Sequence, residues 1–148
     1  MKDTEKQVII RDLGAKLKAL TATAEQLRNV GDQVNGWKPT LGKCHENVDS
    51  WIAAHHGDRA ARGWILTQYL APFGFDRFTS HSVIQTPTGE LLDVTLPLHE
   101  CHHRFVRHPG SDAEFLGLVA NNGCPWIDIP LDGPDPRLDE YQSLGILR

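Results

Sequence analysis

The sequence predicts an α+β domain, and three of its features indicate this class. Apolar side chains recur at helical spacing between residues 5 and 30. A second helical pattern begins at Cys44, directly after a loop that contains proline and glycine. Two strand-like runs, residues 77–86 and 90–96, are joined by Pro87-Thr88-Gly89, a loop typical of a β-hairpin. We therefore expect N-terminal helices packed on a small antiparallel sheet.

Length and composition favour a single domain over residues 1–148. The chain has 148 residues, of which 40% are hydrophobic and 23% are charged, as in ordinary globular proteins. Within this domain we distinguish an N-terminal helical region (1–34), a core (40–96) and an irregular C-terminal segment (97–148).

Charge and hydropathy argue against several classes of function. The net charge of −4 gives no electrostatic reason to bind nucleic acid. No apolar run approaches the roughly 20 residues that a membrane span needs. The charged residues 1–6 do not resemble a signal peptide, so we expect a cytoplasmic protein without a membrane partner. The 3 cysteines are widely spaced and do not suggest a disulfide framework.

Residues 5–30 are predicted to form one amphipathic helix. Its apolar stripe alternates spacings of three and four and comprises Ile10, Leu13, Leu17, Leu20, Ala24 and Leu27, with Val34 continuing it. In the first interpretation this stripe covers the domain's own core. The alternative is contact with a partner helix or with a second copy of the chain.

The other elements are predicted from branched residues and from helix and strand breakers. We expect a helix over residues 44–56, a strand over 62–70 and a loop over 97–109. Residues 113–120 fit either a short helix or a strand. Residues 121–136 are rich in proline and glycine and predict an irregular segment. Trp51 and Trp64 are expected in the core.

Cys44, His81 and Asp93 form the candidate catalytic set. A cysteine at a helix N-terminus lies at the positive end of the helix dipole, which favours the thiolate. If residues 87–89 form the hairpin loop, His81 faces Thr95 and Asp93 faces Val83. His81 and Asp93 then share one face of the hairpin on a diagonal within reach of long side chains. A nucleophile, a base and an orienting carboxylate are therefore predicted to converge.

These residues resemble the core of the transglutaminase-like branch of the papain-like cysteine enzymes. The resemblance covers residues 40–96. It is carried by Gly42-Lys43-Cys44 and the helix that follows, Gly57-Asp58-Arg59-Ala60-Ala61-Arg62-Gly63-Trp64, His81-Ser82-Val83-Ile84 and Leu91-Leu92-Asp93-Val94-Thr95. It implies an α+β domain whose helix packs on an antiparallel sheet.

The resemblance also implies roles for individual residues. Cys44 would be the nucleophile, His81 the base and Asp93 the orienting carboxylate. Relatives often supply a further oxyanion donor upstream of the cysteine, and Trp37 and Asn35 are the available donors here. Trp37 has the alternative role of an aromatic anchor for its loop.

His45 and Glu46 adjoin the nucleophile. Both are candidates for tuning the pKa of the thiol or for binding substrate, with His45 the candidate substrate contact, and both have the favoured alternative of lying on the exposed face of the helix.

His99-Glu100-Cys101-His102-His103 suggests a different function. Such a density of histidine and cysteine is typical of a zinc or other transition-metal site, for which Cys124 and His108 are the distant candidate ligands. Neighbouring ligands rarely converge on one ion, and the alternative is a solvated loop beside the active site. We expect no metal or other cofactor in catalysis.

The sequence therefore predicts a cysteine hydrolase or acyltransferase that acts on an amide, peptide or isopeptide bond in a peptide, a protein or a small amide. Hydrolysis is favoured over crosslinking because the short chain leaves little room to exclude water. One alternative is a non-catalytic binding or assembly module on the same scaffold. The other is a metal-binding protein centred on residues 99–103.

Overall fold

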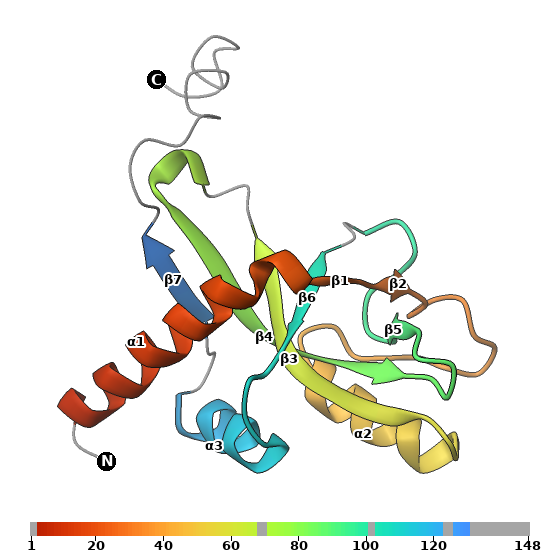
Figure 1. The fold of residues 1–148 in the computed structure, drawn as a ribbon. Helices are drawn as coiled ribbons and strands as arrows, with labels where there is room; N and C mark the ends of the chain where they lie inside the picture. Colours follow the sequence, from red (N-terminus) through yellow and green to blue (C-terminus); the bar gives the residue numbers. More distant parts are fainter. Residues whose placement is uncertain (1–2, 68–70, 101–102, 123–125, 131–148) are drawn as a thin grey trace, which may run out of the picture.

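Seven strands form one sheet, with three α-helices packed on it, in the part of the chain that the computed structural model describes, residues 3–67, 71–100, 103–122 and 126–130 (Figure 1). The helices are α1 (Asp3–Leu20), α2 (Cys44–Ala54) and α3 (Asp112–Asn122). The strands are β1 (Glu25–Gln26), β2 (Arg28–Asn29), β3 (Arg59–Thr67), β4 (Phe75–Gln85), β5 (Leu91–Asp93), β6 (Arg104–Arg107) and β7 (Trp126–Pro130). Short 3₁₀ turns, η1 (Thr21–Thr23) and η2 (Ala71–Phe73), precede β1 and β4. The predicted α+β class is confirmed.

The sheet curls until its two outer strands meet. Its order is β1-β6-β3-β4-β5-β2, and β7 pairs with β4 beside this path. All pairs are antiparallel except β2 with β5. Because only Leu27 separates β1 from β2, one short segment pairs with β6 at one end and with β5 at the other. This segment nearly closes the sheet.

The N-terminal helix ends ten residues earlier than the sequence suggested. α1 stops at Leu20, whereas a helix over residues 5–30 was predicted. The hydroxyl of Thr21 donates to the carbonyl of Leu17 and that of Thr23 to the carbonyl of Leu20. Such local bonds offer the backbone an alternative to the helix. Leu27 continues the helical spacing but is buried from a strand segment.

The central elements agree with their predicted positions. α2 begins at Cys44, and β3, β4 and β5 occupy the three predicted strand regions with shifted ends. Residues 68–70, at the end of the first predicted strand, lie outside the described residues. The hairpin register is confirmed, because Ile84 faces Leu92. Gly89 has φ +90°, the left-handed conformation expected of the last loop residue.

The C-terminal segment is more regular than predicted. The expected loop over 97–109 contains β6, whose Phe105 and Val106 are both buried. Residues 113–120 lie within the helix α3. The irregular segment over 121–136 contains β7, and Ile127 is buried in that strand. Residues 131–148 lie outside the described part of the chain.

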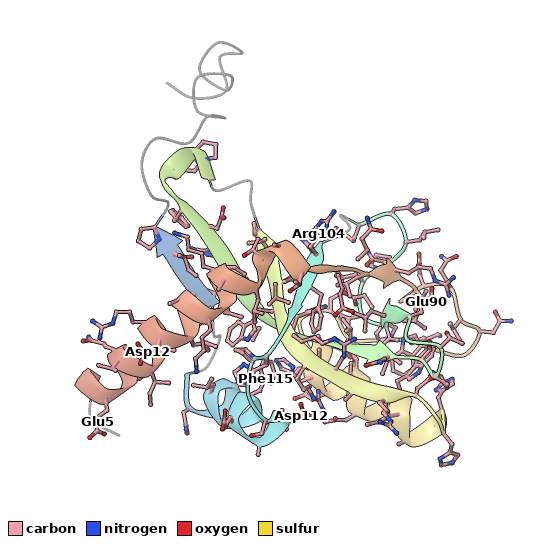
Figure 2. All side chains as sticks on the ribbon, viewed as in Figure 1. Glu5, Asp12, Glu90, Arg104, Asp112 and Phe115 are labelled. Atoms are coloured by element: carbon pink, nitrogen blue, oxygen red, sulfur yellow. The ribbon has the colours of Figure 1, made fainter. Side chains whose placement is uncertain are left out.

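Three apolar clusters form the core: two lie between the helices and one face of the sheet, and the third lies on the opposite face. Leu13 and Leu17 of α1 pack with Trp64. Phe115, which is labelled in Figure 2, joins them from α3. A second cluster joins α2, including Trp51, to the β4–β5 hairpin. The third lies inside the curl of the sheet and includes Leu27, Val83 and Phe105. The predicted burial of Trp51 and Trp64 is confirmed. Within the described ranges, no helix combines the length and the apolar character needed to cross a membrane.

β3 and β6 lie so close together at Gly63 that a larger residue does not fit there. A Cβ at this position would overlap the carbonyl oxygen of Val106 and the ring of Phe105. Gly63→Ala is therefore expected to lower the free energy of unfolding by about 1–3 kcal/mol, because the strands must separate. Urea denaturation measures this loss.

Gly117→Ala in α3 is the matched control. Nothing lies within 4 Å of the Cβ that this substitution adds, so the variant is expected to gain about 0.5–1 kcal/mol from helix propensity. Equal unfolding midpoints for the wild type and Gly63→Ala would contradict the packing described here.

Candidate active site

Cys44 is the first residue of α2 and is partly exposed. The preceding residue, Lys43, takes the N-cap position without a side-chain hydrogen bond to the helix. The first N–H groups of an α-helix have no partner within the helix. The thiol therefore lies among backbone donors and at the positive end of the helix dipole.

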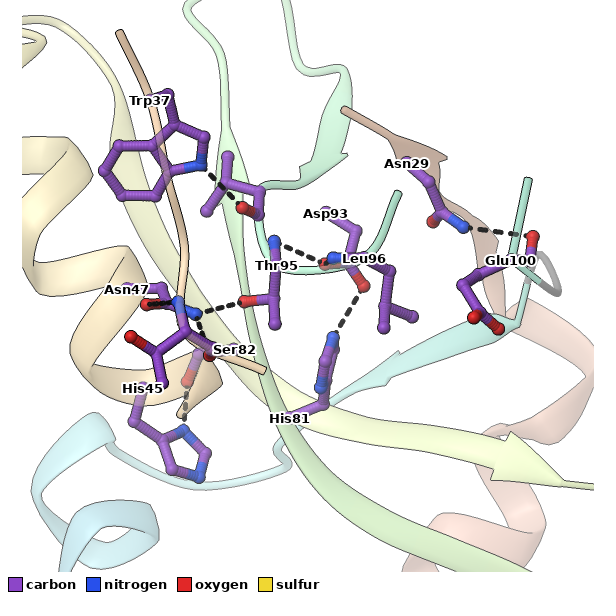
Figure 3. A network of polar contacts seen from close by, with 12 residues as sticks. Asn29, Trp37, His45, Asn47, His81, Ser82, Asp93, Thr95, Leu96 and Glu100 are labelled. Carbon is purple, nitrogen blue, oxygen red and sulfur yellow. Dashed lines mark hydrogen bonds and ion pairs between the residues drawn. The ribbon is translucent and has the colours of Figure 1, made fainter. Parts of the chain in front are cut away.

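His81 and Asp93 meet inside the molecule (Figure 3). Nε2 of His81 lies 2.7 Å from Oδ2 of Asp93, which is 0% exposed. The second carboxylate oxygen accepts the N–H groups of Thr95 at 2.9 Å and Leu96 at 3.0 Å. These bonds fix the carboxylate, so it holds the imidazole in one orientation. The hairpin register thus brings the predicted base to the predicted carboxylate.

The Cys44 thiol lies beside the His81 ring, close enough for each group to shift the pKa of the other. Nε2 of His81 is engaged with Asp93, so Nδ1 is the ring nitrogen left for the sulfur. The three predicted catalytic side chains therefore converge as sulfur, imidazole and carboxylate.

The surroundings favour the charged forms of all three groups. Burial raises the pKa of the Cys44 thiol, but hydrogen bonds and charges from His45 and His81 outweigh it and lower that pKa to about 6. Burial lowers the pKa of His81, but Asp93 and Cys44 together raise it to about 10. Burial also raises the pKa of Asp93, whereas its bond with His81 brings it below the ordinary value. Near neutral pH the site therefore holds a thiolate beside an imidazolium.

An interruption in the sheet brings the thiol to the imidazole. β4 pairs with β7 over residues 75–79 and with β5 over residues 84–85, so residues 80–83 have no ladder partner on this edge within the described ranges. Ile84, which packs against α2, and His81 lie on opposite faces of β4 because side chains alternate along a strand. We interpret the interruption as the point where the start of α2 reaches the face that carries His81.

Of the three residues proposed as oxyanion or substrate contacts, Trp37 and Asn35 lie on the loop before α2 and His45 lies on α2. The indole N–H of Trp37 donates to the carbonyl of Val94 at 2.7 Å, and its ring packs edge-on against Trp51. Trp37 is thus an anchor for its loop, the alternative considered from the sequence. Asn35 is exposed on a turn of the same loop.

His45 is the one of the three that contacts Cys44. It is partly buried and points into the protein, so the exposed-face interpretation of this residue is wrong. Glu46 is exposed, in agreement with that interpretation.

Asn47 is a functional candidate that the sequence interpretation missed. Its amide nitrogen donates to the carbonyl of Thr40 at 2.8 Å and to the hydroxyl of Thr95 at 3.0 Å. Its amide oxygen accepts the N–H of Thr40 at 3.1 Å. These bonds attach the loop before Cys44, and the chain just after Asp93, to the first turn of α2. The available sequence signal was an asparagine, a residue of low helix propensity, in the first turn of the predicted helix.

Arg62 and Ser82 were also missed. They face each other across β3 and β4, and both are buried. Both side chains lie close to His45. The sequence signal was an arginine at the start of the predicted strand 62–70, next to the apolar run Trp64-Ile65-Leu66, because charged side chains are seldom buried without a partner.

The predicted metal loop lies partly outside the described residues. Cys101, His102 and Cys124 lie outside the described residues. His108 accepts a hydrogen bond from the Trp64 indole at 3.2 Å. Among the described residues, no group of three or more histidine, cysteine, aspartate or glutamate side chains is arranged to hold a metal ion.

Comparisons of the chain with models of protein families, with curated proteins and with solved structures gave no match.

The thiolate can be observed directly. The absorbance at 240 nm of the wild type minus that of Cys44→Ser reports this thiol alone, and it is expected to rise as the pH increases through about 6. Below that pH the sulfur binds its proton and the signal is lost. His81→Asn removes the cationic partner, so the transition should move upward by about 1–3 pH units. Identical transitions with and without His81 would show that the two groups do not interact.

Proposed function

We propose that this protein is a cysteine hydrolase or acyltransferase of papain-like, transglutaminase-like mechanism, acting on an amide, peptide or isopeptide bond. One observation carries the proposal. A partly exposed thiol at a helix N-terminus contacts an imidazole whose other nitrogen is held by a buried carboxylate. This is the arrangement that activates a cysteine nucleophile.

The first half of the reaction forms an acyl-enzyme. The Cys44 thiolate attacks the carbonyl carbon of the substrate, and the carbon–oxygen electron pair moves onto oxygen. When the tetrahedral intermediate collapses, the carbon–nitrogen bond breaks and His81 gives its proton to the leaving amine. Cys44 is left as a thioester.

The second half releases the acyl group. Water, or an acceptor amine, loses a proton to His81 as it attacks the thioester carbonyl. The carbon–sulfur bond then breaks and restores the thiolate beside the imidazolium. Asp93 does not take up this proton, because its pKa stays below the ordinary value. Its role is to orient His81 and to stabilise the cationic ring.

The developing oxyanion would bind at the start of α2. The N–H of Cys44 is adjacent to the reacting sulfur and is one of the first-turn donors that lack an intrahelical partner. His45 is the side-chain donor in contact with the sulfur. Trp37 is not assigned to this role, since its N–H is bonded to Val94.

An observation on α1 favours the second candidate, a binding module. Val8 and Ile9 are 44% and 42% exposed, although both are large apolar side chains. A partner helix or a second copy of the chain would cover them. Such a contact is compatible with catalysis, so the two candidates differ in whether Cys44 reacts.

Turnover of an activated ester such as p-nitrophenyl acetate tests the catalytic proposal. The wild type is expected to form an acetyl adduct on Cys44, seen by peptide mass spectrometry, and to release p-nitrophenolate continuously. Cys44→Ala should abolish both signals. His81→Ala should reduce turnover by about 10²–10⁴-fold, because the deacylating water loses its base.

His56→Ala is the matched control, since His56 is an exposed histidine at the end of α2. It should retain wild-type turnover. A wild type that is acetylated no faster on Cys44 than on Cys101 or Cys124 would favour the binding module.

A further inference from the structure

A second chain of polar contacts reaches the nucleophile from the face of β4 opposite to His81. Oδ1 of Asp49 lies 2.6 Å from Nη2 of Arg62. Nη1 of Arg62 donates to Oγ of Ser82 at 2.9 Å. Oγ of Ser82 lies 2.6 Å from Nδ1 of His45, and Figure 3 shows this last contact. The chain therefore runs from an exposed carboxylate to a histidine in contact with Cys44.

Arg62 is the buried charged residue in this series of polar contacts. It is 8% exposed, and a buried guanidinium loses hydration that its partners must replace. The ion pair with Asp49 attaches β3 to α2. The bond to Ser82 adds nothing to that attachment, because it joins neighbouring strands that are already paired. What this bond does fix is the hydroxyl that faces His45.

The hydrogen-bond partners of Ser82 restrict the orientation of its hydroxyl group. Guanidinium groups only donate hydrogen bonds, so Oγ of Ser82 is the acceptor of the bond from Arg62. Ser82 is fully buried, and its short contact with Nδ1 determines how the His45 ring is turned. The bond from a charged donor strengthens the hydroxyl's own interaction with the ring.

Phe115 holds the other side of the His45 ring. The two rings meet edge-on with centroids 5.5 Å apart, and Phe115 is in turn packed edge-on against Trp64 at 5.6 Å. Because both aromatic side chains are fully buried, the imidazole is confined between Ser82 and α3. The His45 ring therefore has a polar contact with Ser82 and a ring contact with Phe115.

We propose that Asp49, Arg62 and Ser82 are positioning residues that hold His45 against the Cys44 sulfur, so that the thiolate is stabilised from both faces of β4. The proposal rests on the proposed function. It gives the two histidines different roles. His81 carries the proton between the sulfur, the leaving amine and the incoming nucleophile. His45 stabilises the negative sulfur, including at the moment when the carbon–sulfur bond of the tetrahedral intermediate breaks and the thiolate forms again.

The test is the rate at which iodoacetamide alkylates Cys44 as a function of pH, measured by peptide mass spectrometry. Ser82→Ala is expected to slow alkylation at pH 6 by about two- to tenfold and to move the inflection to higher pH, because His45 loses the partner that orients it. His45→Gln should have an effect in the same direction. The double variant should be no slower than His45→Gln alone, since Ser82 acts through His45.

Ser80→Ala is the matched control. It is the same substitution in β4, on the same face and at a buried position two residues away, and it should leave the profile unchanged. Thermal unfolding followed by circular dichroism establishes that each variant is folded. If Ser82→Ala does not fold, His45→Gln carries the test, and a wild-type profile in that variant overturns the proposal.

The possible results separate this inference from the proposed function. An inflection of the wild type near the ordinary thiol value of about 8.5 would overturn the proposed function itself. If the alkylation rate of the wild type has a low inflection and Ser82→Ala leaves it unchanged, only the role of the polar contacts from Asp49 to His45 would be overturned. The same conclusion would follow if Ser80→Ala slowed the alkylation of Cys44 as much as Ser82→Ala does. It would also follow if Ser82→Ala slowed alkylation by the same factor when His45 is already replaced by Gln.

Discussion

The hydrogen bond between His81 and the buried Asp93 is the interaction on which the rest of the site depends. A carboxylate that is 0% exposed is stable only if its oxygens are bonded, and here the imidazole and two backbone N–H groups meet that requirement. The backbone of Asp93 is held as well, because its carbonyl accepts the N–H of Val30 at 2.8 Å. Val30 directly follows the segment that nearly closes the sheet, so this part of the chain also holds the backbone of Asp93 in place. Fold and site share the same contacts, so a change in the hairpin register would remove both.

β4 organises the chemistry because its two faces carry different polar groups. His81 points to the inner face, where Asp93 lies, and Ser82 points to the face covered by α2 and α3. Cys44 contacts side chains from both faces, at the point where neither β5 nor β7 pairs with β4 in the described part of the chain. An uninterrupted ladder would separate the thiol from His81. The short length of β5 is therefore a condition for the site as much as a feature of the fold.

Much of this arrangement could be predicted from local chemistry. The Pro87-Thr88-Gly89 loop specifies its register through the conformation of Gly89, and that register alone places the imidazole beside the carboxylate. Other elements depend on contacts that no local pattern contains. Helical spacing continues past Leu20 into a strand, and the position of His45 is determined by α3 and by a buried arginine from another strand. Two local signals in the C-terminal segment were missed. Ser111 accepts the N–H of Glu114 as a helix cap, and Ile127-Asp128-Ile129 alternates apolar and polar residues as a strand does.

The central claim is that Cys44 and His81 exist as a thiolate–imidazolium pair near neutral pH. Nitrogen-15 NMR of the histidine rings tests it most directly, because the shifts of the two ring nitrogens report whether both carry a proton. The His81 signals, assigned by their loss in His81→Asn, should show a doubly protonated ring at pH 8, since the pKa of this group is raised to about 10. In Cys44→Ser, without the thiolate, the ring should lose its proton at a lower pH. A His81 ring that is neutral at pH 8 in the wild type and titrates near the ordinary value of about 6.5 would contradict the account.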